Sequence, residues 1–198
     1  MTETAYPVKF SIDYPDKPLN RVTTFFRIFM AIPIFIIWGL MGGPSQNNNG
    51  TLGLLFFPTI LMLLFKKKYP KWWFDWNLEL TRFFTRILAY LALLRDEYPS
   101  TDEEQAIHVD IYYPDASKLS RGLPLVKWFL AIPHYIVLYF LFIAAMIVTI
   151  VAWFAILFTG VYPRGMFDFV VGVYRWSMRV NAYAFILTTD EYPPFSLD

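Results

Sequence analysis

The apolar and polar positions of the chain form two long apolar runs, two short alternating segments and two amphipathic segments. The longest apolar run extends from Lys127 to Gly160, and the next charged residue is Arg164. One membrane span needs roughly 20 apolar residues, or about 30 Å of helix. The run is longer than that, and backbone in lipid must satisfy its own hydrogen bonds, so we expect helix in a bilayer. It predicts a tight helical hairpin with its turn near residues 142–146. Those residues contain no turn former, and one long tilted helix is the alternative.

The first half predicts a similar hairpin. Val22 to Leu40 is apolar enough for a span, and Pro33 lies inside it, as Pro133 does in the later run. Proline removes a backbone hydrogen bond and usually kinks a helix. A neutral, turn-rich loop at residues 41–51 follows, and residues 52–65 form a short apolar return before three lysines.

Two segments alternate between apolar and polar residues. They are Val8 to Tyr14 and Ile107 to Tyr113, and each ends before a proline. The alternation predicts two short strands. They could pair into a small sheet outside the membrane, and extended loops at the interface are the alternative.

Charged residues recur at helical spacing in residues 69–94 and 162–187. The steps of three and four place them on one stripe of each helix. The stripes are Asp75, Glu79, Arg82 and Arg86 in the first segment and Asp168, Gly172, Arg175 and Arg179 in the second. Such a helix either lies in the membrane interface or buries its stripe in a bundle.

These features occur twice in the same order. Residues 21–33 match residues 121–133 without a gap, and each half closes on Asp-Glu-Tyr-Pro, at 96–99 and 190–193. We therefore expect two tandem repeats, residues 1–105 and 106–198. The predicted fold is an all-α integral membrane protein. Each repeat is a helical hairpin plus an amphipathic interfacial helix, with a short β-strand before it.

The second repeat resembles a family of bacterial membrane proteins, the domain of unknown function 4389. The resemblance rests on Tyr-Pro-Asp at 113–115, Ala-Ile-Pro-His at 131–134, and the segments 153–160, 162–173 and 190–195. It covers essentially all of residues 106–198. The first repeat departs from it through its polar loop and through Trp72-Trp73 in place of Gly165-Met166. The resemblance implies a fold and a bacterial membrane location, and no activity.

The composition agrees with a membrane protein. Hydrophobic residues make up 57% and aromatic residues 20% of the chain, and aromatic rings favour the membrane interface. A net charge of +1 does not suggest a nucleic-acid partner. The chain has no cysteine, no metal-ligand spacing and no catalytic motif, so we expect no cofactor, no metal and no enzyme.

The basic residues predict the sidedness. They flank the apolar runs, while the loop at 41–51 carries no charge, so the positive-inside rule places the flanks in the cytoplasm. We expect a multi-pass protein of the bacterial cytoplasmic (inner) membrane. It would have four spans and both termini in the cytoplasm.

The arginine pairs are the candidate site. Arg82 with Arg86, and Arg175 with Arg179, lie one turn apart and could hold a lipid phosphate. Internal pairing with the acids Asp75, Glu79 and Asp168 is the alternative interpretation. His134, at the start of the longest run, we expect to be packed or to face the interface.

Three functions remain open from the sequence. The first is a non-catalytic accessory or scaffold subunit of a membrane complex, with membrane lipids and other subunits, or further copies of itself, as partners. The second is a phospholipid-binding or lipid-handling protein that uses the arginine pairs. A small transporter ranks last, because the apolar runs lack polar groups near mid-membrane.

Overall fold

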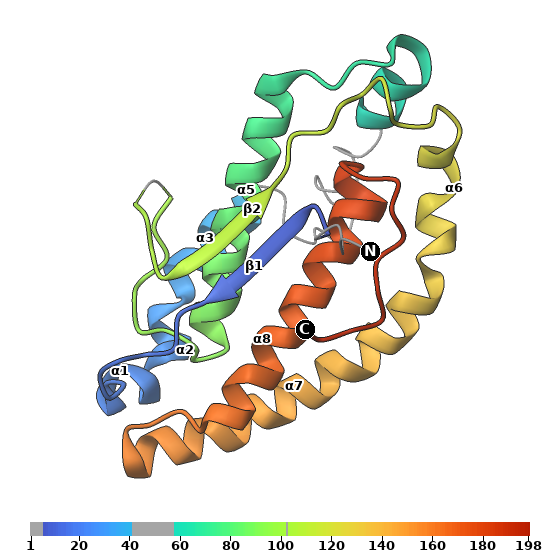
Figure 1. The fold of residues 1–198 in the computed structure, drawn as a ribbon. Coiled ribbons are helices and arrows are strands. Elements are labelled where there is room, and N and C mark those ends of the chain that lie inside the picture. Colours follow the sequence, from blue (N-terminus) through green and yellow to red (C-terminus); the bar gives the residue numbers. More distant parts are fainter. Residues whose placement is uncertain (1–5, 41–57, 102) are drawn as a thin grey trace.

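The computed structural model describes residues 6–40, 58–101 and 103–198, and it places a small sheet on two layers of helices (Figure 1). The first half contains β1 (Val8–Ile12), α1 (Arg21–Phe25), α2 (Arg27–Met30), α3 (Ile32–Leu40), the π-helical turn η1 (Met62–Lys66) and α5 (Lys71–Leu91). The second half contains β2 (Ile107–Ile111), α6 (Leu123–Leu130), α7 (Ile132–Thr159), α8 (Arg164–Asn181) and the π-helical turn η2 (Ala182–Ile186). The predicted loop at 41–51 and the first part of the predicted return, residues 52–57, lie outside the described residues.

The two strands pair with each other, as the alternating pattern predicts. β1 and β2 are antiparallel, and Phe10 lies opposite Val109 at the centre of the sheet. Both strands bury every second side chain. The buried face covers the helices and the polar face is left exposed. The choice between a sheet and extended loops is therefore settled in favour of the sheet.

The helices form a middle and an outer layer. β1 lies on α8 and β2 lies on α5, so each strand packs against the amphipathic helix of the other half (Figure 1). On its far side α8 packs against α7, and α5 packs against α2 and α3 through a cluster that includes Ala31, Ile34 and Phe83. One large core contains residues of both halves.

The predicted hairpin in the second half is wrong. Residues 132–159 form one continuous helix, α7, with 28 residues, which is the alternative that the sequence left open. Residues 142–146 contain no glycine or proline, and nothing there interrupts the backbone ladder. The helix ends at Gly160, whose φ of 77° is the left-handed conformation that glycine adopts at low cost.

The first predicted span is interrupted rather than only kinked. It is divided into α1, α2 and α3, with breaks at Phe26 and Ala31. The second half has the same break at Ala131, between α6 and α7. In both halves the proline lies two residues after the break, in the first turn of the next helix. A missing N–H costs little there.

Candidate membrane-binding surface

Helix α7 exposes most of its apolar side chains. The mean hydropathy of its most apolar 18-residue window is 2.8, and only 17% of that window is buried inside the protein. The buried residues follow one narrow stripe that faces the rest of the fold: His134, Leu138, Ala145, Ala152 and Ile156. Among the described residues it is the one helix long and apolar enough to cross a membrane. That part of the chain therefore does not support four spans.

The neighbouring helices extend this surface. On α6, Trp128 and Phe129 are exposed, and on α1 and α2 so are Phe25, Ile28 and Phe29. α1 lies against α7, and the indole N–H of Trp153 on α7 donates to the Thr24 carbonyl oxygen on α1 at 3.2 Å. We call the exposed side of α1–α3, α6 and α7 the apolar surface. A contiguous exposed apolar area of this extent normally has a lipid or protein covering it.

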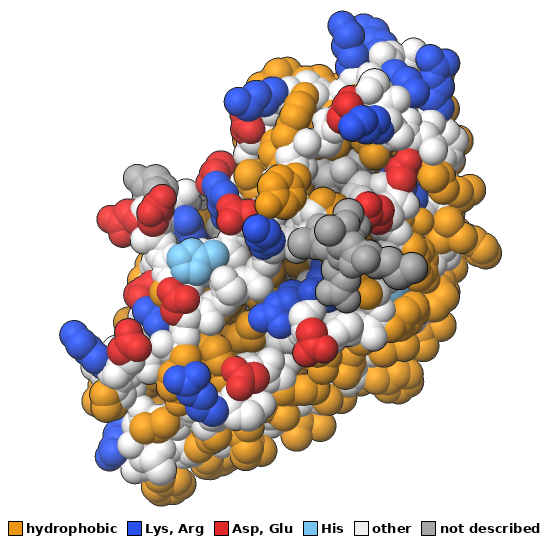
Figure 2. All heavy atoms as spheres, in the orientation of Figure 1, with side chains coloured by type: hydrophobic (Ala, Val, Ile, Leu, Met, Phe, Trp, Pro, Cys, Tyr) orange, Lys and Arg blue, Asp and Glu red, His pale blue; other side chains and the backbone are white. Residues whose placement is uncertain are grey.

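The opposite side of the molecule is polar. The exposed face of the sheet carries Lys9, Ser11, His108 and Asp110. Figure 2 shows charged side chains over the strands and hydrophobic side chains along the edge formed by α6 and α7. The fold therefore separates a charged face from an apolar one, with the layer of α5 and α8 between them.

Two of the four candidate arginines bind the edges of the sheet. The N–H of Asp13 donates to the Ala106 carbonyl oxygen, and the N–H of Tyr112 donates to the Pro7 carbonyl oxygen. Hydrogen-bonded and non-hydrogen-bonded pairs alternate along an antiparallel ladder, so the pair Phe10 and Val109 is not bonded across the sheet. The carbonyls of these two residues therefore point to the free edges. Arg175 Nε donates to Phe10 and Arg82 Nε donates to Val109, each at 3.0 Å. The two guanidinium groups thus satisfy strand carbonyls that would otherwise be free to pair with another chain.

The other two arginines hold the segments that end each half. Arg86 donates to the Ser100 carbonyl oxygen at 2.8 Å. Arg179 donates to the carbonyl oxygens of Ser196 and Asp198. These are contacts within the chain, but they go to backbone carbonyl oxygens and not to the acids that the internal alternative names. Headgroup binding by these residues stays a prediction.

The candidate acids differ from one another. Glu79 pairs with Arg82 at 2.7 Å. Asp75 and Asp168 are exposed and make no ion pair with any residue that the structure describes. Arg82 also reaches Asp110 of β2 at 3.2 Å, a partner that helical spacing cannot reveal.

Two buried cations were missed in the sequence. Lys127 is fully buried, and its Nζ lies 2.7 Å from a carboxylate oxygen of Asp190 and 2.6 Å from the Thr189 carbonyl oxygen. Arg27, at the equivalent position of the first half, pairs with Asp96. The signal was present in the repeated basic residue four positions before Ala-Ile-Pro and in the repeated Asp-Glu-Tyr-Pro.

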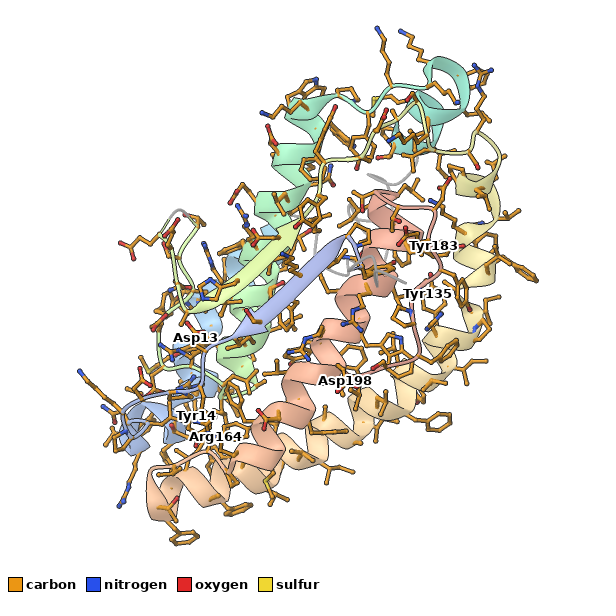
Figure 3. All side chains as sticks on the ribbon, in the orientation of Figure 1. Asp13, Tyr14, Tyr135, Arg164, Tyr183 and Asp198 are labelled. Atoms are coloured by element: carbon orange, nitrogen blue, oxygen red, sulfur yellow. The ribbon has the colours of Figure 1, made fainter. Side chains whose placement is uncertain are left out.

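Burial and pairing act in opposite directions on these cations. Burial lowers the pKa of Lys127, and the hydrogen bond that Lys127 donates to the Asp190 carboxylate opposes that shift. Each cation also lies over a tyrosine ring, Lys127 over Tyr183 at 5.2 Å and Arg27 over Tyr90 at 4.3 Å. Figure 3 labels Tyr183 beside the C-terminal segment and shows Arg164 next to Tyr14, where α8 begins.

His134 is packed, as expected. It is fully buried, and its Nδ1 accepts a hydrogen bond from the Trp176 indole at 3.0 Å. Phe195 stacks on its ring with centroids 3.9 Å apart. Within the described ranges no three His, Cys, Asp or Glu side chains are grouped so that they could hold a metal ion.

The comparisons with known proteins give one match, to part of the chain. No curated protein and no solved structure matches this chain. One family model matches, over a single segment, so the tandem repeat stays a prediction. Residues 124–196, from α6 to the C-terminal segment, match the family described as Domain of unknown function (DUF4389), the family that the motifs of the second half resemble.

Proposed function

We propose that this chain is a non-catalytic membrane protein that embeds its apolar surface in one leaflet of the bacterial cytoplasmic membrane. Its charged sheet would face water as a docking platform for other subunits of a complex. The observation that carries the proposal is the exposed, uncharged face of α7. Burying one large apolar side chain contributes about 1.5–3 kcal/mol, so leaving this face in water is costly.

The position of the sheet favours insertion along the membrane over insertion across it. The Tyr174 ring lies 6.1 Å from that of Phe142, in the middle of α7, and the next residue, Arg175, bonds to β1. If α7 stood upright in a bilayer, the sheet would be carried to mid-membrane depth. Its exposed Asp13 and Asp110 would then meet lipid, at about 2.5–3.5 kcal/mol per charge.

Cysteine labelling tests the orientation, because the native chain contains no cysteine. Single variants Ser120→Cys and Val161→Cys place a thiol before α6 and after α7, Phe140→Cys places one on the exposed face of α7, and Ser11→Cys marks the sheet. We expect a membrane-impermeant maleimide to label Ser120→Cys, Val161→Cys and Ser11→Cys from the same side of sealed vesicles. Phe140→Cys should react only after detergent is added. Labelling of the two helix ends from opposite sides would contradict insertion in one leaflet.

Charge reversal tests the platform. Lys9→Glu combined with Asp110→Lys changes the sheet face without changing the net charge. A protein subunit that co-purifies stoichiometrically in mild detergent should be lost from this variant. The matched control, Lys17→Glu with Asp16→Lys, changes a turn outside the strands and should retain it. A subunit retained equally by both variants would place its docking site elsewhere.

A further inference from the structure

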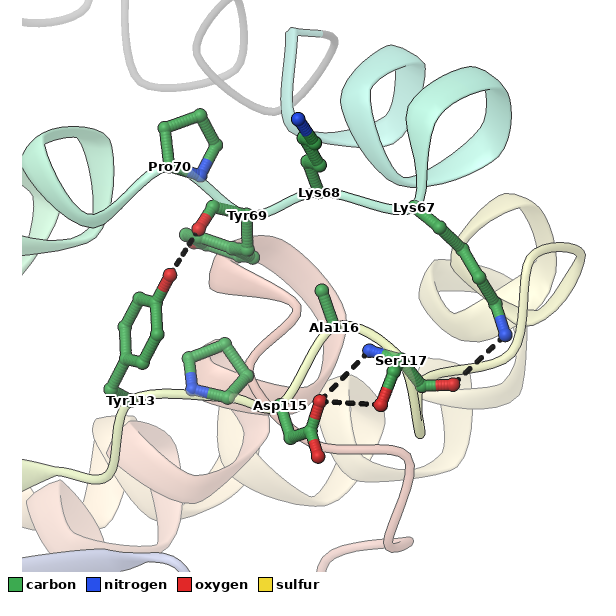
Figure 4. A pocket seen from close by; sticks show the side chains of 9 residues that line it. Lys67, Lys68, Tyr69, Pro70, Tyr113, Asp115, Ala116 and Ser117 are labelled. Carbon is green, nitrogen blue, oxygen red and sulfur yellow. Dashed lines mark hydrogen bonds between the residues drawn. The ribbon is translucent and has the colours of Figure 1, made fainter.

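A pocket lies where the connection between η1 and α5 meets the connection between β2 and α6. Its volume is about 620 Å³, and residues 67–70 and 113–117 line it (Figure 4). Tyr113 donates a hydrogen bond to the Tyr69 carbonyl oxygen on one side. Lys67 Nζ donates to the Ser117 carbonyl oxygen at 2.9 Å on the other. The two connections are therefore tied together at both ends of the pocket.

The surroundings of the pocket are strongly basic. Lys67 and Lys68 line it, Lys66 and Lys71 are close along the chain, and Lys118 follows the second lining segment. Figure 2 shows Lys and Arg side chains gathered at this end of the molecule. Among the described residues Lys68 makes no ion pair, so its charge is available to a ligand.

One carboxylate also lines the pocket. Asp115 accepts hydrogen bonds from the Ser117 hydroxyl at 2.6 Å and from the Ser117 N–H at 3.0 Å, and Lys118 Nζ lies 3.9 Å away. The hydroxyl and N–H of Ser117 lower the pKa of Asp115, so it is ionised at neutral pH. The Asp115 carboxylate is bound by Ser117 and Lys118 of its own loop. The lysines around the pocket are more numerous than this one acid, so the pocket keeps a net positive charge.

The backbone of Lys67 supplies an independent observation. Its φ is 48°, in the left-handed region that side chains other than glycine and asparagine rarely adopt. The equivalent residue of the second half is Gly160, also left-handed, followed by Val161 instead of a lysine. The turn itself therefore favours glycine. Lysine is strained at this turn, as Leu93 and Leu187 are at theirs, and its side chain donates the hydrogen bond to Ser117 that closes one end of the pocket.

Two exposed aromatic side chains lie next to the pocket lysines along the chain. Phe65, just before the lysines, and Trp72, just after them, are 74% and 68% exposed. Aromatic rings next to lysines are typical of the headgroup level of a membrane, where lysine stems lie on apolar groups and the ammonium reaches the phosphates. We propose that this lysine pocket binds the phosphate of an anionic phospholipid headgroup, such as phosphatidylglycerol. The lipid as the source of that phosphate rests on the membrane location proposed above.

Lipid titration of the detergent-purified full chain, followed by native mass spectrometry, tests the pocket. Each lysine near an anionic surface contributes about 1 kcal/mol, so Lys67→Gln/Lys68→Gln should bind phosphatidylglycerol about 30-fold more weakly at low salt. Binding of phosphatidylcholine should not change. The control Lys17→Gln/Arg21→Gln removes the same charge from two exposed residues outside the pocket and the sheet and should bind like the native chain. Equal losses in the two variants, or no preference for phosphatidylglycerol, would overturn the proposal.

A third variant separates binding from folding. Lys67→Gly relieves the left-handed backbone but also removes the bond to Ser117, so it should bind phosphatidylglycerol more weakly while its melting temperature stays close to that of the native chain. Weaker binding with a lower melting temperature would mean that the loss reflects damage to the fold, and would count against the pocket.

Two further arms identify the source of the phosphate and separate the two proposals. Soluble glycerol phosphate should bind far more weakly than the lipid, and equal, lysine-dependent binding would overturn the lipid as the source. All variants should stay in the membrane after a carbonate wash. Release of the native chain would end the membrane proposal, whereas retention with no headgroup preference would end only the pocket.

Discussion

At the scale of single residues, each half of the chain has a buried cation near its start that pairs with an aspartate near its end. Lys127 and Arg27 are both at most 3% exposed, and each pairs with the aspartate of Asp-Glu-Tyr-Pro. The second oxygen of Asp190 accepts from the backbone N–H of Ser120 at 2.7 Å, and that of Asp96 accepts from Asn20 in the same way. One carboxylate thus ties the end of each half to the start of its first helix.

Asp190→Asn should therefore destabilise the protein by about 3 kcal/mol, because it leaves the charge of Lys127 buried without a counter-ion. It should also lower the pKa of Lys127, since the hydrogen bond that Lys127 donates to the Asp190 carboxylate opposes the effect of burial. Chemical unfolding in detergent micelles measures the first effect.

Glu191→Gln is the matched control for Asp190→Asn, because it removes one negative charge from the neighbouring, exposed residue. It should change the free energy of unfolding by less than about 0.5 kcal/mol. An Asp190→Asn variant as stable as this control would contradict the role given to the buried pair.

At the scale of the elements, α7 packs through small residues on one stripe. Ala145 and Ala152 are 4% and 0% exposed, and they are two turns apart. Small side chains at these positions let neighbouring backbone approach closely. The rest of the helix makes few contacts within the chain.

Ala152→Leu should cost about 1–3 kcal/mol, because the added methylenes have no room against the neighbouring helices. Ile150→Leu, on the exposed face, keeps the side-chain volume and should have little effect. Melting temperatures in detergent compare the two. If Ala152→Leu melts like the native chain, α7 is not held by this stripe.

At the scale of the whole molecule, the two halves exchange their packing partners. β1 of the first half lies on α8 of the second, and β2 lies on α5. The Tyr14 hydroxyl donates to the Tyr162 carbonyl oxygen, just as Tyr113 donates to Tyr69. The division at residue 105 stays a prediction, and the described contacts join the halves through one core.

Residues 106–198 expressed alone should therefore lack a cooperative fold, because β2 would have no partner strand and two strands are already a marginal sheet. Hydrogen exchange at residues 107–111 should be fast in this fragment and slow when residues 1–105 are co-expressed. Strong protection of β2 in the isolated fragment would show that the second half folds without the first.

The strands and the amphipathic helices could be predicted from the sequence because each depends on the spacing of apolar and polar residues within its own segment. Alternation at residues 8–12 and 107–111 and the three-four spacing in α5 and α8 depend only on which face each side chain occupies. The uncharged run after Lys127 was sufficient to predict a helix. No residue between 142 and 146 was available to turn it, so the hairpin should have ranked below the single helix.

What only the tertiary structure decided is which surfaces meet. Spacing places Arg82 and Arg175 on a stripe, but it cannot show that the stripe lies on the sheet, where strand carbonyls 27 and 165 residues away accept the guanidinium hydrogens. The same holds for Lys127 with Asp190 and for the pocket beside Lys67. These contacts depend on how distant segments pack, whereas helix, strand and apolar character depend on neighbours along the chain.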